Sequence, residues 1–371
     1  MRAVLISDLH LRTKEPLDGP TPWRLEEKLR VLRDAVETYM AEGDALFVLG
    51  DVFDTREPPE WLKLKFWECL VPIFMENDPD RRHQVFILLG NHDSNLQHHA
   101  FESDDFLVSC LTDNVKIIDA PTSELISGTT FTMVPYCKQD DMKAAINKAL
   151  ESDFIQDSGN SHVLLGHCEV DGAVMGPAQI RIKAQVHPSD LVGFSAAVFG
   201  HIHQAQGGRY EGGTWHYLGS PVYQDFGEME DPTKGFGILV ADPDMELRIQ
   251  PTNPIEMVQL TIEDTEEPTD AELEAIHDKA VKVIFRGEES FLKSKDVSTM
   301  REFWLDQERK GEIRKVMFDT FCTDRQVDNA DEQAASLEEE MRKLCAERDA
   351  EKLLDIGMNL LQEAKDEAAA G

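Results

Sequence analysis

Short apolar runs alternate with polar breaks through the first 240 residues of the chain. Five of these runs are rich in β-branched and aromatic residues, as buried strands are: Ala3–Ile6, Ala45–Leu49, Val85–Leu89, Val163–Leu165 and Ala196–Phe199. Apolar residues at three- and four-residue spacing between the first two runs predict a helix over residues 25–40. A second helix is predicted from Pro58 to Glu76, with Pro72 ending or kinking it. This alternation of strand and helix predicts an α/β architecture.

The pattern changes in the second half of the chain. The glycine-rich stretch at residues 207–220 predicts a β-hairpin, and Gly235–Val240 reads as a strand. Acidic residues then crowd around Pro268. Three further elements predict a small α+β unit: Val281–Phe285 (strand), Val297–Glu308 (helix) and Lys315–Phe321 (strand). Residues 331–364 carry leucine stripes that predict two amphipathic helices.

The length of the chain bounds its number of domains, and its net charge limits the partners it can bind alone. A chain of 371 residues exceeds the roughly 250–300 residues at which single cores stop growing, so at least two domains are expected. The 71 acidic residues outnumber the 37 basic ones, giving a net charge of −34. DNA binding rests on Lys and Arg neutralising phosphates, so we expect this chain to bind DNA poorly without metal ions or a partner.

The cysteines and the N-terminal residues indicate the cellular compartment of the protein. The six cysteines form no CxxC pair, and a chain of this length does not need disulfides for stability. The first residues, MRAVLISDLH, hold no apolar stretch of signal-peptide length, and nowhere do about 18 apolar residues follow one another. We therefore expect a cytoplasmic protein, in a bacterium or a phage-infected host, without membrane association.

Each of the five apolar runs ends in residue types that bind metal ions. The five motifs are Asp8-Leu9-His10, Gly50-Asp51-Val52-Phe53-Asp54, Gly90-Asn91-His92-Asp93, Gly166-His167 and Gly200-His201-Ile202-His203. In an open α/β sheet the carboxyl ends of the strands face one edge, which would bring these loops together. The set contains Asp, His and Asn but no thiolate, which suits Mn²⁺, Fe²⁺ or Zn²⁺ at a hydrolytic centre. Each motif alone is weak evidence for a metal site, but the five motifs in this order predict one.

This ordered set resembles the calcineurin-like metallophosphoesterase superfamily, whose pattern is D-x-H, G-D-x-x-D, G-N-H-D/E, G-H and G-H-x-H. The resemblance implies a β-sandwich flanked by helices and two divalent ions, most simply Mn²⁺, with Mg²⁺, Fe²⁺ or Zn²⁺ as alternatives. One ion would be held by Asp8, His10, Asp51 and His203, and the other by Asp51, Asn91, His167 and His201. Asp51 would bridge the two ions.

The chemistry of such a pair is phosphoester hydrolysis. Two divalent ions about 3.5–4 Å apart can activate water, neutralise a phosphodiester and stabilise both the attacking and the leaving oxygen. His92, beside Asn91 but not assigned to a metal, would protonate the leaving oxygen. Asp93 would orient His92, or it would cap the turn. Asp54 would contact substrate or a metal ligand, or it would cap a loop.

Segments outside the metal motifs resemble the SbcD nuclease subunits and their bacteriophage relatives. These are GDVFDTREPP, the stretch from Tyr217 to Pro221 with the following Asp225-Phe226-Gly227-Glu228, the VPYC segment and the stretch from His167 to Gly172. The resemblance implies a catalytic domain at 1–260, an α+β capping domain at 261–330 and a helical partner-docking segment at 331–371. It further implies DNA as substrate, exonuclease or endonuclease activity in repair, recombination or replication, a homodimer, and an SMC-like ATPase partner of the SbcC type. The C-terminal helices could instead pack on the capping domain.

Two other functions remain open from the sequence. One is a metal-dependent phosphodiesterase or phosphatase acting on a small molecule or a phosphoprotein, although this chain carries GDVFDT and GNHD where protein phosphatases carry GDxVDRG and GNHE. The other is a scaffold that has lost its metals, against which the intact residues of all five motifs argue.

Overall fold

The computed structural model describes residues 1–14, 23–75, 84–95, 98–102, 115–151, 161–176, 178–231, 233–241, 245–263 and 268–323. The predicted docking segment at 331–371 lies outside these residues. By the density of contacts the chain divides into two compact units. Among the described residues the second unit contains 262–263, 285–299 and 320–323, and the first contains the others. The predicted boundaries at 260 and 330 stay a prediction.

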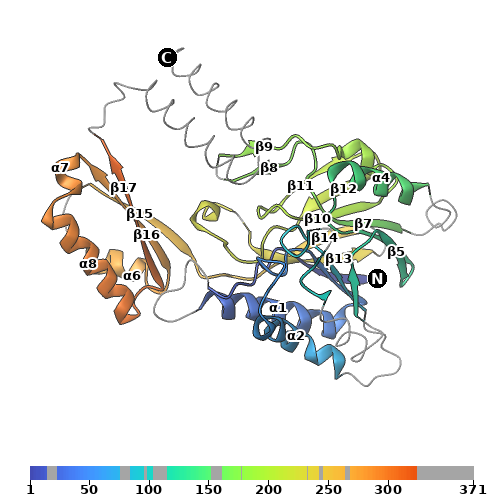
Figure 1. Cartoon of the computed structure of the whole chain (residues 1–371), viewed down its shortest axis with the longest axis horizontal. Coiled ribbons are helices and arrows are strands. Elements are labelled where there is room, and N and C mark those ends of the chain that lie inside the picture. The colour runs from blue at the N-terminus through green and yellow to red at the C-terminus, as the bar shows by residue number, and fades with distance from the viewer. Residues whose placement is uncertain are drawn as a thin grey trace, which may run out of the picture. The chain divides into compact units, whose positions relative to one another are not determined.

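The first sheet has six strands in the order β14-β13-β1-β2-β3-β4. Figure 1 labels β13 and β14 of this sheet, and the helices α1 (Arg24–Glu42) and α2 (Glu60–Phe74). Their bounds are β1 Arg2–Ile6, β2 Ala45–Leu49, β3 Val85–Leu88, β4 Val115–Ile118, β13 Gly235–Ala241 and β14 Met245–Pro251. Strands β1 to β4 run parallel, and β13 is antiparallel to both β1 and β14. The first three predicted strands therefore lie side by side, with their carboxyl ends at one edge.

The second sheet also has six strands, in the order β11-β12-β10-β7-β6-β5. Their bounds are β5 Thr122–Ile126, β6 Thr129–Val134, β7 Ser161–His167, β10 Ala196–Gly200, β11 Gln206–Tyr210 and β12 Gly213–Tyr217. Strands β6, β7, β10 and β12 are parallel, whereas β11 and β12 form the predicted antiparallel hairpin. Because β7 and β10 belong to this second sheet, the five motifs come from two sheets, as the β-sandwich implied by the resemblance requires.

Side chains that alternate along each strand explain why two sheets form. In β1, Ala3 and Leu5 pack into a core shared with Val163 and Leu165 of the second sheet. Val4 and Ile6 point to the opposite face, against the helices α1 (Arg24–Glu42) and α2 (Glu60–Phe74). Since both faces are buried, the strands read as continuous apolar runs. The result is the predicted α/β class, a sandwich of two sheets flanked by helices.

The remaining helices and short elements complete the first unit. Helix α4 (Gln139–Leu150) packs its buried Met142 and Ile146 on the outer face of the second sheet. Two 3-10 helices, η2 (Pro188–Leu191) and η3 (Phe226–Glu228), and a two-stranded hairpin of β8 (Val174–Met175) and β9 (Ile180–Arg181) lie in the connections. Pro72 lies inside α2, which ends two residues later at Phe74.

The chain beyond residue 256 forms a third sheet, in the order β15-β16-β17. Its elements are β15 Met257–Ile262, α6 Asp270–Ala275, β16 Ala280–Gly287, α7 Glu289–Leu292, α8 Lys295–Lys310 and β17 Lys315–Cys322. The predicted elements at 281–285, 297–308 and 315–321 fall within β16, α8 and β17. No helix of the described residues has the length and apolar character needed to cross a membrane.

Candidate metal centre

The five motifs meet where the carboxyl ends of strands from both sheets converge. Backbone strain is concentrated there, because Asp8, His10, Asp51 and His201 all adopt positive φ angles of 46–94°. Such angles are costly for residues with a side chain, and they persist where the surrounding structure imposes them. Gly90 is needed at this junction because a Cβ atom on it would collide with Oδ1 of Asp51.

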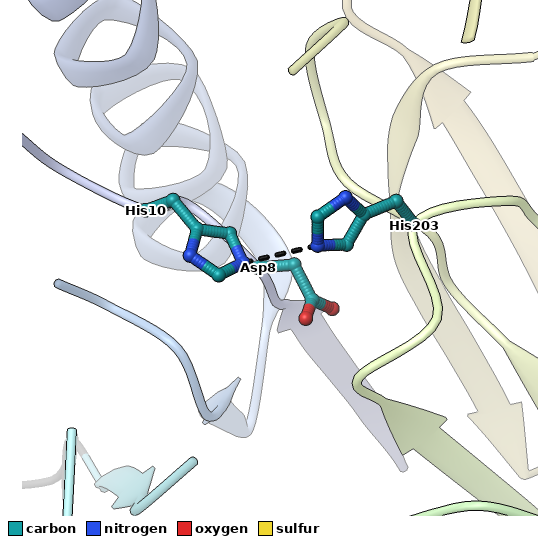
Figure 2. A group of neighbouring side chains, drawn as sticks. All are labelled: Asp8, His10 and His203. Carbon is teal, nitrogen blue, oxygen red and sulfur yellow. Dashed lines mark hydrogen bonds between the residues drawn. The ribbon is translucent and has the colours of Figure 1, made fainter. Parts of the chain in front are cut away.

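Asp8, His10 and His203 form the first cluster that can hold an ion (Figure 2). The Nε2 atoms of His10 and His203 lie 3.0 Å apart. The Asp8 carboxylate is fixed by the hydroxyl of Ser7 (2.6 Å) and by the backbone N–H of His201 (3.0 Å). These three residues come from the ends of β1 and β10, so residues almost 200 positions apart in sequence share one site.

Asp51, His167 and His201 form the second cluster. The Asn91 side-chain oxygen lies 3.0 Å from Nε2 of His167 and 2.8 Å from Nδ1 of His201, which places the amide of the third motif among them. The predicted set for the second ion is therefore gathered in one place.

Asp51 lies between the two clusters. Its Oδ2 atom is 3.5 Å from Nε2 of His10 and 3.4 Å from Nε2 of His167. Its Oδ1 atom accepts a hydrogen bond from the backbone N–H of His92 (2.9 Å). One carboxylate oxygen thus faces a histidine of each cluster, as a bridging ligand must.

The histidine rings are oriented so that nitrogen lone pairs point into the site. His167 donates its Nδ1–H to the carbonyl of Leu49 (2.7 Å), and Nδ1 of His203 lies 2.9 Å from the Glu228 carboxylate. In a neutral imidazole the other nitrogen is then an acceptor. The two Nε2 atoms of His10 and His203 face each other at 3.0 Å, and two lone pairs repel unless a proton or a cation lies at them. The donor set therefore fits divalent ions held by these residues.

The charges of the site also favour cations. Burial opposes ionisation of Asp51, but His167 and His10 beside it hold the pKa of its carboxyl well below the ordinary value. Burial alone would lower the pKa of His167. The neighbouring Asp51 carboxylate has the larger effect and raises that pKa to about 9. Because a metal ligand must be deprotonated, an ion that binds His167 near neutral pH displaces a proton.

Asp93 joins the loops of the second and third motifs. Its buried carboxylate accepts hydrogen bonds from the backbone N–H groups of Phe53 (2.9 Å), Gly90 (3.1 Å) and Val52 (3.2 Å). Burial and the nearby Asp51 raise its pKa to about 7. The alternative interpretation, a residue that caps and joins two loops, agrees with these contacts. The role of Asp93 in orienting His92 stays a prediction.

Asp54 lies beside His92. The His92 Nδ1 atom lies 3.2 Å from the Asp54 carbonyl oxygen and 3.8 Å from its carboxylate, which also lies 3.5 Å from Nδ1 of His10 and 3.0 Å from Arg12. The His92 side chain is partly exposed, so it can reach a bound molecule. His10, Asp54 and His92 also form a third group that could hold an ion.

Sequence reasoning gave no role to Glu228, which supports the first cluster. Its carboxylate contacts His203 through Oε1, and through Oε2 it accepts hydrogen bonds from the backbone N–H of Gln224 (2.9 Å) and from the buried Lys234 (2.7 Å). Burial opposes ionisation, but the hydrogen bond to His203 and the charge of Lys234 lower the Glu228 pKa to about 2. The signal for this residue was the Asp225–Glu228 stretch, which carried the resemblance to nucleases.

We expect Glu228→Gln to lower Mn²⁺ affinity about 10- to 100-fold. Carboxylates that hydrogen-bond to metal-binding imidazoles orient them, and mutating such a carboxylate typically lowers metal affinity by that factor. Isothermal titration at pH 7 would measure it. The charged Glu228 also stabilises the fold above its unfolded pKa of 4.5, and this contribution is lost as the pH falls toward 2. Glu230→Gln, the same change at a neighbouring exposed carboxylate, should leave Mn²⁺ affinity unchanged. Equal affinity of the Glu228→Gln protein and the wild type would contradict this role.

The chain is similar to a known family and to a viral protein. The family model of the calcineurin-like phosphoesterases matches residues 1–205. A phosphoesterase of Invertebrate iridescent virus 3, 078R, is 28% identical over 153 residues, which are 41% of this chain and 41% of the viral protein. The chain thus matches about two fifths of the length of that curated relative.

Several solved structures are also similar to this chain at low identity. A dimetal phosphatase from Danio rerio is 13% identical with a TM-score of 0.41, covering 68% of this chain and 97% of its own. An archaeal phosphodiesterase is 11% identical with a TM-score of 0.36, covering 67% and 100%. GAP50, the anchor in the inner membrane complex of Plasmodium, is 13% identical with a TM-score of 0.39, covering 68% and 85%.

The match covers more than half of the 371 residues, and the Asp and His clusters lie within it. The chain therefore belongs to the calcineurin-like phosphoesterase family.

Proposed function

We propose that this protein is a Mn²⁺-dependent DNA nuclease that hydrolyses phosphodiester bonds as the nuclease subunit of an SbcCD-type complex in DNA repair or recombination. The observation that carries the proposal is the position of the nuclease-like segment at 225–228. This segment does not follow from the five metal motifs, yet its Glu228 contacts the metal-site residue His203 directly.

Each side chain then has a defined task. Asp8, His10, Asp51 and His203 would hold one ion, and Asp51, Asn91, His167 and His201 the other. The ions would supply charge neutralisation of the phosphate and activation of water. Glu228 orients His203, and the Leu49 carbonyl orients His167. His92, held beside Asp54, would give its proton to the leaving oxygen.

The direct test is incubation of the purified protein with end-labelled linear duplex and single-stranded DNA in Mn²⁺. Bis(p-nitrophenyl) phosphate is assayed in parallel as a small phosphodiester. DNA degradation is the expected result. If only the small ester is cleaved, the assay is repeated with the ATPase partner, and DNA that stays intact in its presence would favour the small-molecule phosphodiesterase.

An apolar row on helix α2 supports the proposed homodimer. Trp61, Leu64, Val71 and Met75 are 49%, 58%, 43% and 68% exposed. The spacing of three and seven residues places Trp61, Leu64 and Val71 on one face of the helix, and Met75 directly follows its last residue, Phe74. A second copy of the chain would cover such a face by pairing α2 with α2, because a two-fold interface brings the same patch of both subunits together.

We expect Leu64→Glu to weaken the dimer at least tenfold, since burying one leucine side chain contributes about 1.5–3 kcal/mol. Light scattering over a concentration series would show the shift from dimer to monomer. Leu125→Glu, at a comparably exposed leucine of β5, is the control and should leave the dimer intact. A Leu64→Glu protein that stays dimeric at every concentration would contradict this interface.

The ATPase partner is proposed to bind the leucine-striped segment at 331–364. Truncation after residue 330 should abolish co-purification with the ATPase subunit, while hydrolysis of bis(p-nitrophenyl) phosphate stays within about twofold of the full chain. All the strands and helices from β1 to β17 end before residue 330. Activity on the small ester should therefore survive the truncation. Retained co-purification would contradict the docking proposal.

A further inference from the structure

A pocket of about 430 Å³ opens beside the metal-site residues His201 and His203. Its walls are the tip of the β8–β9 hairpin, the loop after β10 and the segment at 225–231. This volume is within the range of small-ligand sites, roughly 300–1,000 Å³. A molecule whose phosphate lies at the metal centre would therefore extend a neighbouring group into this pocket.

The pocket is acidic. Asp225, Glu228, Glu230 and Asp231 line it, and no lysine or arginine is among its described lining residues. Lys234 contacts Glu228 (2.7 Å) and Asp231 (2.8 Å) and so offsets part of their charge. Glu230 is exposed and has no partner in the described part of the chain. Its charge and that of Asp225 therefore face a bound molecule.

The hydrogen-bonding groups of the pocket are mainly acceptors. Gln179 donates its side-chain N–H groups to the Gly176 carbonyl (3.1 Å) and to the side-chain oxygen of Gln204 (3.0 Å). Its own side-chain oxygen is left to accept. Asp225 uses Oδ1 for the Gly227 N–H (2.6 Å), and Oδ2 is left as a second acceptor. Such a lining favours groups that donate hydrogen bonds, and each carboxylate about 4 Å from a phosphate would cost about 1 kcal/mol or more.

We propose that this pocket holds the uncharged nucleoside next to the scissile phosphate and excludes a second phosphate. The enzyme then prefers a strand end that carries a hydroxyl group over one that carries a phosphate. The inference rests on the proposed hydrolysis of nucleic-acid phosphodiesters. This preference is the reverse of the one expected from two metal ions without the acidic pocket. The ions alone would bind a molecule with two phosphates more tightly than a molecule with one.

The test measures binding of three probes in excess Mn²⁺: thymidine 5′-monophosphate, thymidine 3′-monophosphate and thymidine 3′,5′-bisphosphate. Competition against bis(p-nitrophenyl) phosphate hydrolysis gives the inhibition constants, and equilibrium dialysis gives affinities without catalysis. We expect the bisphosphate to bind at least fivefold more weakly than the better monophosphate. In the Asp225→Asn/Glu230→Gln double variant this ratio should fall below two. The amide introduced by Asp225→Asn retains an oxygen that can accept from the Gly227 N–H.

Glu211→Gln is the matched control, because Glu211 is an exposed carboxylate in the β11–β12 turn and does not line the pocket. It should keep the wild-type ratio. Equal or tighter binding of the bisphosphate by the wild type would overturn the proposal, as would an unchanged ratio in the double variant. Failure of the nuclease proposal is distinguishable, since linear DNA would then stay intact while the probes are still discriminated.

Discussion

Replacing Asp51 with asparagine is expected to lower phosphodiester hydrolysis by about a thousandfold or more. Asp51 Oδ2 lies 3.5 Å from His10 and 3.4 Å from His167, so it is the one carboxylate oxygen that faces both clusters among the described residues. Metal ions contribute several kcal/mol to transition-state stabilisation, and about 4 kcal/mol corresponds to a thousandfold in rate. An amide keeps the shape but loses the negative charge with which Asp51 would hold the two cations.

Steady-state hydrolysis of bis(p-nitrophenyl) phosphate and metal content by atomic absorption would measure the effect. We expect the Asp51→Asn protein to retain fewer than two ions per chain at saturating Mn²⁺. Asp119→Asn makes the same substitution at an exposed position after β4 and should match the wild type in both measurements. An Asp51→Asn enzyme with wild-type rate and metal content would refute the bridging role.

Replacing His92 with asparagine is expected to slow DNA hydrolysis by about 100-fold or more while leaving bis(p-nitrophenyl) phosphate hydrolysis within a few fold. A positioned general acid contributes about 10²- to 10⁴-fold where the leaving oxygen needs a proton. The alkoxide released from DNA needs one, whereas nitrophenolate leaves without it. The backbone N–H of residue 92, which donates to Asp51, is kept in this variant.

Metal content separates this role from metal binding. His92 lies with His10 and Asp54 in a group that could itself hold an ion, so loss of an ion in the His92→Asn protein would assign His92 as a ligand. The general-acid role requires an unchanged metal content. An equal loss of rate on both substrates would also contradict it. His99→Asn, at a histidine a few residues further along the chain, is the control and should behave as the wild type.

The strand ends and metal motifs could be predicted because both are local properties. A strand buried on both faces has a continuous apolar run, and a polar Asp or His marks the end of that run. Asp8 and Asp51 lie two residues past their strands, and His167 is the last residue of β7. The helices α1 and α8 were likewise predicted within a few residues from their apolar spacing. Pro72 was expected to limit α2, which does end soon after it.

The contacts of Asp93, Asp54 and Glu228 could not be predicted because they depend on pairs of distant segments. Asp93 is adjacent to His92 in sequence, but the turn directs its carboxylate to the backbone of Val52 and Phe53. Asp54 comes from the loop after β2 and lies beside His92. Glu228 reaches His203 across 25 residues.

The sequence by itself therefore determined the elements, the five ligand-bearing loops and the family, because apolar periodicity and residue type act over a few neighbouring positions. Tertiary structure alone decided that β7 and β10 lie in a second sheet, that one oxygen of Asp51 faces both clusters, and that an acidic pocket adjoins His203. These features arise where strands of two sheets end side by side. Their geometry is set by how the two sheets pack on their shared core, which no local pattern encodes.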